Sequence, residues 1–282
     1  MSGAHPLPQT PIHRLRRRFR PRQRPRFRGL SFNRMVPNLL TMLGLCSGLT
    51  GMRFALEGRF AAAAIAITVA GAIDGLDGRI ARLLKATSRF GAEFDSLTDF
   101  LCFGVAPGFV LYLWSLDGAR GWGFLPSLMF AVCMALRLAR FNAGLYADRP
   151  HPAYTYNFFT GVPAPAGAGL ALFPLFLGLE GQAVGWHWLV ALAHSPFLCA
   201  PVLVGTALLL VSTLPVWNFK NFKVPAPYAL PLLLGTGLVA AMLVAEPWAV
   251  LAGLGIVYLA MLPFSVRSFR RLREAAEITP EA

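Results

Sequence analysis

Apolar residues run along most of this chain in long stretches, and the charged residues are concentrated between them. Eight of these stretches have the length of a membrane-spanning helix, which needs about 20 apolar residues. They fall near 36–57, 60–82, 92–115, 122–145, 158–180, 197–216, 226–245 and 247–265. The pattern predicts an all-α, polytopic helical membrane protein. The last two stretches are separated only by Glu246 and Pro247, so a hairpin or a re-entrant pair is also compatible with them.

The composition agrees with this class of protein. Of the 282 residues, 56% are hydrophobic and 14% are charged, whereas a soluble domain carries about 25% charged residues. We expect one transmembrane domain over 35–266, between a basic arm (1–34) and a basic tail (267–282). The arm holds ten arginines and several prolines, which disfavour a regular helix. We interpret it as a disordered segment lying on anionic headgroups, with no nucleic acid as partner.

Positive charge predicts the orientation of the chain in the membrane. With eight spans both termini lie on one side, and all but three of the 26 basic residues fall on that side. The exceptions are Arg53, Arg59 and Arg120. Basic loops stay in the cytoplasm, so we expect an integral protein of the bacterial inner membrane with both termini in the cytoplasm.

Acidic residues are concentrated in the second and third stretches, although carboxylates inside membrane helices are costly and usually functional. Five of the thirteen acidic residues lie within 26 positions: Asp74, Asp77, Glu93, Asp95 and Asp99. Four of them fall on two helical stripes, because residues three, four, seven and eight apart share a helix face. One stripe holds Asp74, Asp77, Gly78, Ala81 and Arg82, and the other holds Gly91, Asp95 and Asp99.

The stripes predict a metal site. A polar turn over 85–89 allows the two helices to pack antiparallel, which would bring four carboxylates into one cavity near the cytoplasmic surface. Such carboxylates repel each other unless cations neutralise them, and their oxygens suit Mg²⁺ or Mn²⁺. Two such ions could clamp a diphosphate. Gly78, Ala81 and Gly91 leave room for a flat ring, and Arg82 could bind a phosphate oxygen.

In spacing and residue type, these eight positions resemble the signature of the CDP-alcohol phosphotransferase family. The likeness covers about residues 38–169 and includes the opening PNLLT at 37–41. It implies that Asp74, Asp77, Asp95 and Asp99 bind two divalent ions and that Asp99 is the catalytic base. It also implies that Gly78, Ala81, Arg82 and Gly91 contact the nucleotide and diphosphate. The implied fold is a six-helix core, commonly a homodimer, to which this chain adds two C-terminal helices.

The segments TSRFGAEFDSLTDFLCFGVAPG (87–108), RLARFN (137–142) and FFTGVPAPAGAG (158–169) are similar to the phosphatidylserine synthase branch of that family. Thr98 and Cys102 depart from it, where alanine and serine are more usual. The resemblance implies transfer of a phosphatidyl group from CDP-diacylglycerol to L-serine, with membrane lipids as surroundings. The same chemistry with glycerol 3-phosphate, an inositol phosphate or choline is the alternative. A cation transporter is a remote one.

Four further polar residues each allow more than one interpretation. Arg137 and Arg140 share a helix face near the predicted cytoplasmic surface, so either could bind the acceptor's carboxylate or a lipid phosphate, or anchor the helix to headgroups. Asn38 and Thr41 could bind the donor's diphosphate or nucleobase, or cap the first helix. The sequence leaves these alternatives open.

Overall fold

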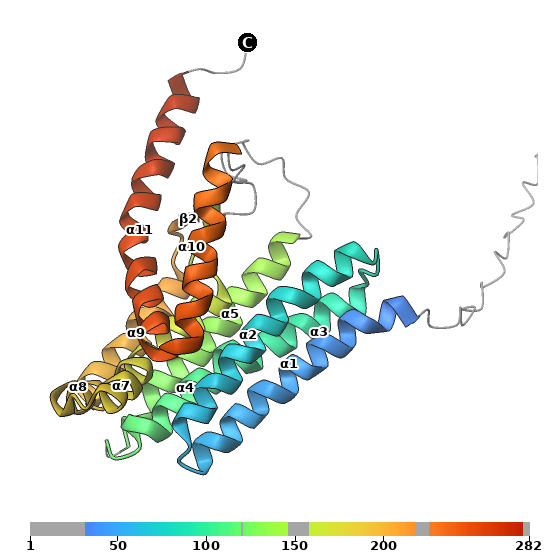
Figure 1. Ribbon diagram of the computed structural model, residues 1–282. Helices are drawn as coiled ribbons and strands as arrows, with labels where there is room; N and C mark the ends of the chain where they lie inside the picture. The colour runs from blue at the N-terminus through green and yellow to red at the C-terminus, as the bar shows by residue number, and fades with distance from the viewer. Residues whose placement is uncertain (1–31, 120, 146–157, 218–225, 279–282) are drawn as a thin grey trace, which may run out of the picture. The chain divides into compact units, whose positions relative to one another are not determined.

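The computed structural model describes residues 32–119, 121–145, 158–217 and 226–278 (Figure 1). Most of the predicted arm and residues 279–282 of the predicted tail lie outside the described residues. The elements are α1 (Phe32–Leu56), α2 (Phe60–Leu83), α3 (Arg89–Asp99), the π-helical turn η1 (Phe100–Val105), α4 (Ala106–Leu111), the π-helical turn η2 (Tyr112–Leu116), α5 (Phe124–Leu145), β1 (Phe158–Thr160), α6 (Ala164–Ala171), α7 (Phe173–Val184), α8 (His187–Ala193), α9 (Pro196–Val211), β2 (Pro215–Trp217), α10 (Ala226–Ala245) and α11 (Pro247–Ile278).

Six helices of the described residues are long and apolar enough to cross a membrane, or up to eight if two bent pairs each form one span. The predicted class, a polytopic helical membrane protein, is therefore confirmed. The first pair, α6 and α7, meets at 47° and overlaps the predicted fifth span; the second, α8 and α9, meets at 52° and begins at His187, before the predicted sixth span starts at 197. Each second helix has a proline in its first turn, Pro174 or Pro196, where the missing N–H does no harm.

The third span combines α3, η1, α4 and η2 without a break. The π-helical turn η1 begins directly after Asp99. Pro107 follows in the first turn of α4 and has no N–H to offer the carbonyl one turn before it. Such π turns are often found at functional sites, and this one changes the helix geometry beside a predicted metal ligand.

Small residues bring α1 and α2 into close contact, and the two helices lie side by side (Figure 1). A methyl group added to Gly51 would lie 3.2 Å from the Ala63 carbonyl oxygen. The Ser47 hydroxyl donates to the Ala66 carbonyl over 2.8 Å. Small residues allow such approach between membrane helices, and here it places α1 against the helix that carries Asp74 and Asp77.

The strand β1, just before α6, pairs with β2, just after α9, in a two-stranded antiparallel ribbon. Phe158 lies opposite Trp217. The sequence analysis instead predicted membrane spans over 158–180 and 197–216, which include β1 and most of β2. Arg140 fixes the ribbon, because its guanidinium donates to carbonyl oxygens of the last turn of α9 and of β1. The acceptors are Val211 (2.8 Å), Ser212 (3.1 Å), Leu210 (3.2 Å) and Thr160 (3.4 Å). A cation is favourable at a helix C-terminus.

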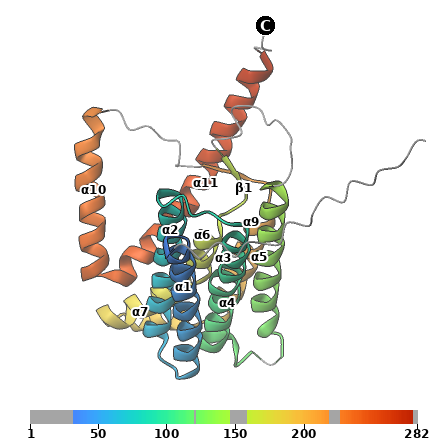
Figure 2. The same ribbon diagram turned by 90° about the vertical axis from the view of Figure 1, so that its right-hand side faces the viewer.

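The C-terminal helices extend the fold beyond the six-helix core that the sequence predicts. Helix α10 meets α11 at the turn around Glu246 and is otherwise exposed (Figure 2), whereas α11 packs against α7 and β2. The Ser265 hydroxyl donates to the Pro215 carbonyl over 2.7 Å, and the rings of Phe158 and Phe269 meet edge to face at 5.1 Å. Helix α11 continues to Ile278, beyond the predicted end of the last span at 265. It is therefore joined to the core at several points.

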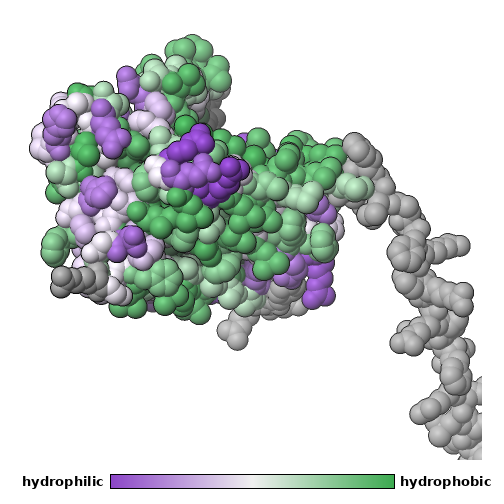
Figure 3. All heavy atoms as spheres, turned by 90° about the horizontal axis from the view of Figure 1, so that it is seen from below, coloured by the Kyte–Doolittle hydropathy of each residue, from purple (hydrophilic) through white to green (hydrophobic). Residues whose placement is uncertain are grey.

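Large apolar side chains are exposed on most helices, including Leu43 on α1, Ile65 on α2 and Leu233 on α10. Figure 3 shows one face on which apolar side chains predominate and hydrophilic ones are gathered in small groups. A soluble monomer rarely exposes so much contiguous apolar surface. The exposed side chains are thus those of a protein surrounded by lipid.

Candidate active site

Three of the predicted aspartates converge between α2 and α3, both of which pack against α1. Asp74, Asp95 and Asp99 each present a carboxylate oxygen within 4.8 Å of the others. The turn between the helices is shaped by Lys85, which has a φ of +49°. The first turn of α3 is capped by Ser88, whose hydroxyl accepts a 3.0 Å hydrogen bond from the Gly91 N–H. This capping is typical of a helix start, and it sets the register that points Asp95 and Asp99 toward Asp74.

Asp77 lies beside this cluster and is held by α1. Its side chain is 4% exposed and accepts a 2.7 Å hydrogen bond from the Thr41 hydroxyl. It remains within electrostatic range of Asp74 and Asp95. The sequence predicts four carboxylates in one cavity. The structure brings three together and places the fourth next to them, with its own partner.

The cluster has the features of a cation site. Asp74 and Asp99 approach within hydrogen-bonding range of each other, and one carboxylate oxygen of Asp99 is buried with no hydrogen-bond partner. Within the described residues, the ion pairs found join Arg53 and Arg59 to Glu57, away from this cluster. Arg137 is one positive charge near three carboxylates, and buried carboxylates that outnumber their counter-charges are unfavourable. These oxygens therefore fit a divalent cation, which the cluster could hold.

A cavity of about 510 Å³ adjoins the acidic residues between α1, α2 and α3. Its volume is in the range of small-molecule sites. All six residues that were predicted to contact the nucleotide or diphosphate line it, together with two of the aspartates. They are Asn38, Thr41, Gly78, Ala81, Arg82 and Gly91, with Asp77 and Asp95.

The glycines in this cavity differ in the space around them. A methyl group added to Gly78 would meet no atom within 4 Å, so the wall is open there. One added to Gly91 would lie 2.9 Å from the Asn38 side-chain oxygen. Arg82 donates from its Nε to the Gly78 carbonyl over 3.0 Å, within its own helix. That bond orients Arg82 at the rim of the cavity, where a phosphate could meet the rest of its guanidinium.

The two arginines of α5 have different surroundings. Arg137 donates from its Nε to the Val162 carbonyl over 2.6 Å and lies within electrostatic range of Asp99. Arg140 instead binds the backbone of the β1–β2 region, as described above. Of the two, Arg137 is the one beside the acidic cluster.

Two polar contacts near the site were not singled out from the sequence. Asn142 on α5 donates to the Ser96 hydroxyl on α3 over 3.0 Å, which ties α3 to the helix that carries Arg137. Tyr258 on α11 lies within electrostatic range of Arg137. A lone tyrosine in an apolar span gives no signal of this kind, because the contact joins helices far apart in the chain.

A membrane-embedded cluster of carboxylates beside a nucleotide-sized cavity is the arrangement of an enzyme that handles a diphosphate at a lipid surface. A model of the CDP-alcohol phosphatidyltransferase family matches residues 34–197, more than half of the chain. A second model, CDP-alcohol phosphatidyltransferase 2, matches residues 227–263. The chain belongs to the CDP-alcohol phosphatidyltransferase family, as its aspartate pattern predicts.

Similarity to individual proteins gives a more specific comparison than the family model. The chain is similar to the CDP-diacylglycerol–serine O-phosphatidyltransferase of Mycobacterium tuberculosis, with 42% identity over 248 residues, 86% of this chain and 82% of the relative. It resembles the protein of that name from Helicobacter pylori at 35% identity over 189 residues, 67% and 74% of the two chains. It also resembles the archaetidylserine synthase of Methanothermobacter thermautotrophicus, at 35% identity over 138 residues, 47% and 54% of the chains.

Proposed function

We propose that this protein is a CDP-diacylglycerol–serine O-phosphatidyltransferase, which makes phosphatidylserine and CMP. The observation that carries the proposal is the convergence of Asp74, Asp95 and Asp99 beside the cavity lined by the predicted nucleotide residues. The similarity to relatives of that name over most of the chain supports serine as the acceptor. Serine is thus preferred to glycerol 3-phosphate, an inositol phosphate or choline.

The acidic residues would hold Mg²⁺ or Mn²⁺, for which two ions are proposed. The ions would supply positive charge to the donor's diphosphate, which is the role of paired ions in phosphoryl transfer. Asp74, Asp95 and Asp99 would be the ligands nearest one another, with Asp77 completing the site. The Thr41 hydroxyl orients Asp77 through its 2.7 Å hydrogen bond. Thr41 thus holds this proposed ligand in place.

The positions of the polar groups support the following reaction. Asp99 accepts the proton of the serine hydroxyl, and the serine oxygen bonds to the phosphorus that bears diacylglycerol. The bond from that phosphorus to the oxygen of CMP breaks, and CMP leaves. Arg137, beside Asp99, binds the serine carboxylate. Gly78 and Ala81 give the cytidine room, and Arg82 binds the diphosphate from the rim.

The setting of the enzyme is also part of the proposal. The distribution of basic residues supports a bacterial inner membrane protein with its active site and both termini facing the cytoplasm. A homodimer is proposed by resemblance to the family. A cation transporter is disfavoured, because an ion path needs acidic residues spread along its length, whereas these four lie on neighbouring turns of two helices.

CMP release tests the function directly. Purified protein in detergent is given CDP-diacylglycerol, Mn²⁺ or Mg²⁺, and one candidate alcohol at a time. We expect serine-dependent CMP release that EDTA abolishes and that either ion restores. Release with another alcohol but not with serine would contradict the acceptor. The absence of release with any alcohol, from protein with a cooperative thermal transition, would contradict the enzyme assignment.

The open wall at Gly78 gives a second test. Valine at position 78 meets no atom of the protein near its Cβ, so the fold should be retained while the side chain enters the space proposed for the nucleotide. We expect Gly78→Val to raise the KM for CDP-diacylglycerol at least about tenfold, equivalent to about 1.4 kcal/mol of binding free energy.

Gly75→Val is the matched control for this change. Gly75 lies on the same helix, is exposed, has the same open space around it and does not line the cavity. Its donor KM should stay at the wild-type value. Equal KM values for the two variants would show that the nucleotide does not bind at Gly78.

A further inference from the structure

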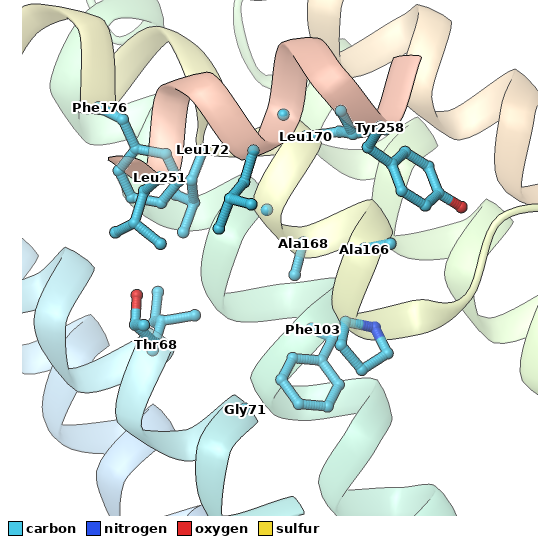
Figure 4. A pocket seen from close by; sticks show the side chains of 15 residues that line it. Thr68, Gly71, Phe103, Ala166, Ala168, Leu170, Leu172, Phe176, Leu251 and Tyr258 are labelled. Atoms are coloured by element: carbon cyan, nitrogen blue, oxygen red, sulfur yellow. The ribbon is translucent and has the colours of Figure 1, made fainter. Parts of the chain in front are cut away.

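A second cavity of about 270 Å³ lies next to the acidic cluster, between α2, η1, α6, α7 and α11. Two of its wall residues stand one helical turn from metal-site residues: Gly71 precedes Asp74 by three positions, and Phe103 follows Asp99 by four. Most of the wall is apolar, as Figure 4 shows for Leu170, Leu251 and their neighbours. A cavity with such a lining fits a hydrocarbon chain better than a polar acceptor.

The polar side-chain groups of this wall are the hydroxyls of Thr68 and Tyr258. The Thr68 hydroxyl is satisfied within its own helix, where it donates to the Ala64 carbonyl over 2.8 Å. The Tyr258 hydroxyl oxygen is buried and has no hydrogen-bond partner among the described residues. Buried polar groups are nearly always paired, so this hydroxyl has an unused capacity for one hydrogen bond.

The position of Tyr258 indicates which part of a ligand it meets. In Figure 4 its ring lies at one end of the cavity, and its hydroxyl is directed away from Leu251 and Phe176. Tyr258 is within electrostatic range of Arg137, which is in turn within range of Asp99. The hydroxyl therefore points from the apolar end of the cavity toward the charged site.

We infer that the Tyr258 hydroxyl donates a hydrogen bond to an oxygen in the glycerol–phosphate region of the lipid donor, one acyl chain of which occupies this cavity. The inference rests on the proposed function, because it takes the donor to be CDP-diacylglycerol. An amphiphile with an apolar chain and an oxygen-rich head matches a cavity that is apolar along its walls and polar at one end. The donor site then includes α11, which lies outside the first matched segment, 34–197, and begins within the second, 227–263.

Tyr258→Phe removes the hydroxyl and keeps the ring. In mixed micelles at saturating serine, we expect the KM for CDP-diacylglycerol to rise about fivefold, the effect of one neutral hydrogen bond. The KM for serine and kcat should stay within about twofold of wild type. Tyr228→Phe, on exposed α10 and outside the cavity, is the matched control and should leave all three constants unchanged. An unchanged donor KM in Tyr258→Phe, or a raised KM for serine in its place, would overturn the inference.

The acyl chain is tested separately by Gly169→Leu. Gly169 lines the cavity, and a methyl group added there would meet no atom within 4 Å. We expect the donor KM to rise about tenfold for long acyl chains and by less than about threefold for six-carbon chains. Gly205→Leu, on α9 with similar open space, is the matched control. Equal effects on both chain lengths would place the acyl chain elsewhere.

Failure of the proposed function can be distinguished from failure of this inference. Serine-dependent CMP release by the wild-type protein is measured first, and its absence would contradict the proposed function. If the wild type is active and both Tyr258→Phe and Gly169→Leu keep the wild-type donor KM, the proposed function stands and this inference is wrong.

Discussion

Asp99→Asn is expected to lower kcat by about 10³-fold, within the range found for loss of a general base. Asparagine keeps the shape of the side chain but cannot accept the serine proton, and it brings one less negative charge to the cation site. Asp99 also combines proximity to Asp74 with a buried oxygen that has no partner. The measurement is CMP release at saturating CDP-diacylglycerol, serine and Mn²⁺.

Thermal unfolding separates this effect from misfolding. Without added metal, Asp99→Asn should unfold at the same temperature as wild type or higher, because one of three mutually repelling carboxylates is gone. Added Mn²⁺ should stabilise the wild type by binding its folded form and the variant by less. Glu93→Gln makes the same chemical change on the same helix outside the cluster, and it should keep wild-type turnover. Normal turnover in Asp99→Asn would falsify its role as base.

Much of the site could be predicted because helical periodicity is a local property. Positions three, four and seven apart place Asp74 with Gly78 and Asp95 with Asp99 whatever the helices pack against. The polar turn between the stripes then leaves one antiparallel arrangement. The lining of the larger cavity by all six predicted residues follows from these two facts together with the position of α1.

Contacts between distant segments could not be predicted in this way. The hydrogen bond from Thr41 separates Asp77 from the other carboxylates, and it depends on how closely small residues let α1 approach α2. Arg140 shares a stripe with Arg137, yet its guanidinium binds the end of α9, some 70 residues later in the chain. Hydropathy likewise cannot locate the bend before Pro174, since α6 and α7 are both apolar and the predicted fifth span runs across them.

Arg137→Gln is expected to lower kcat/KM for serine by about 10²-fold, the scale of losing one charged group that contacts a substrate or transition state. The Arg137 Nε donates a 2.6 Å hydrogen bond to the Val162 carbonyl, and its guanidinium lies within electrostatic range of Asp99. Glutamine could keep a hydrogen bond to Val162 but has no charge for the serine carboxylate. The effect should appear mainly in the KM for serine.

Two arginine variants provide the contrast. Arg79→Gln removes the same charge from the exposed end of α2 and should leave the KM for serine unchanged. Arg140→Gln should instead lower the unfolding temperature, because four carbonyl groups around the end of α9 lose a charged donor. If Arg140→Gln, in protein that remains folded, raised the KM for serine as much as Arg137→Gln, serine recognition could not be assigned to Arg137. A rise confined to Arg137→Gln would place the serine carboxylate near Arg137, between α5 and Asp99.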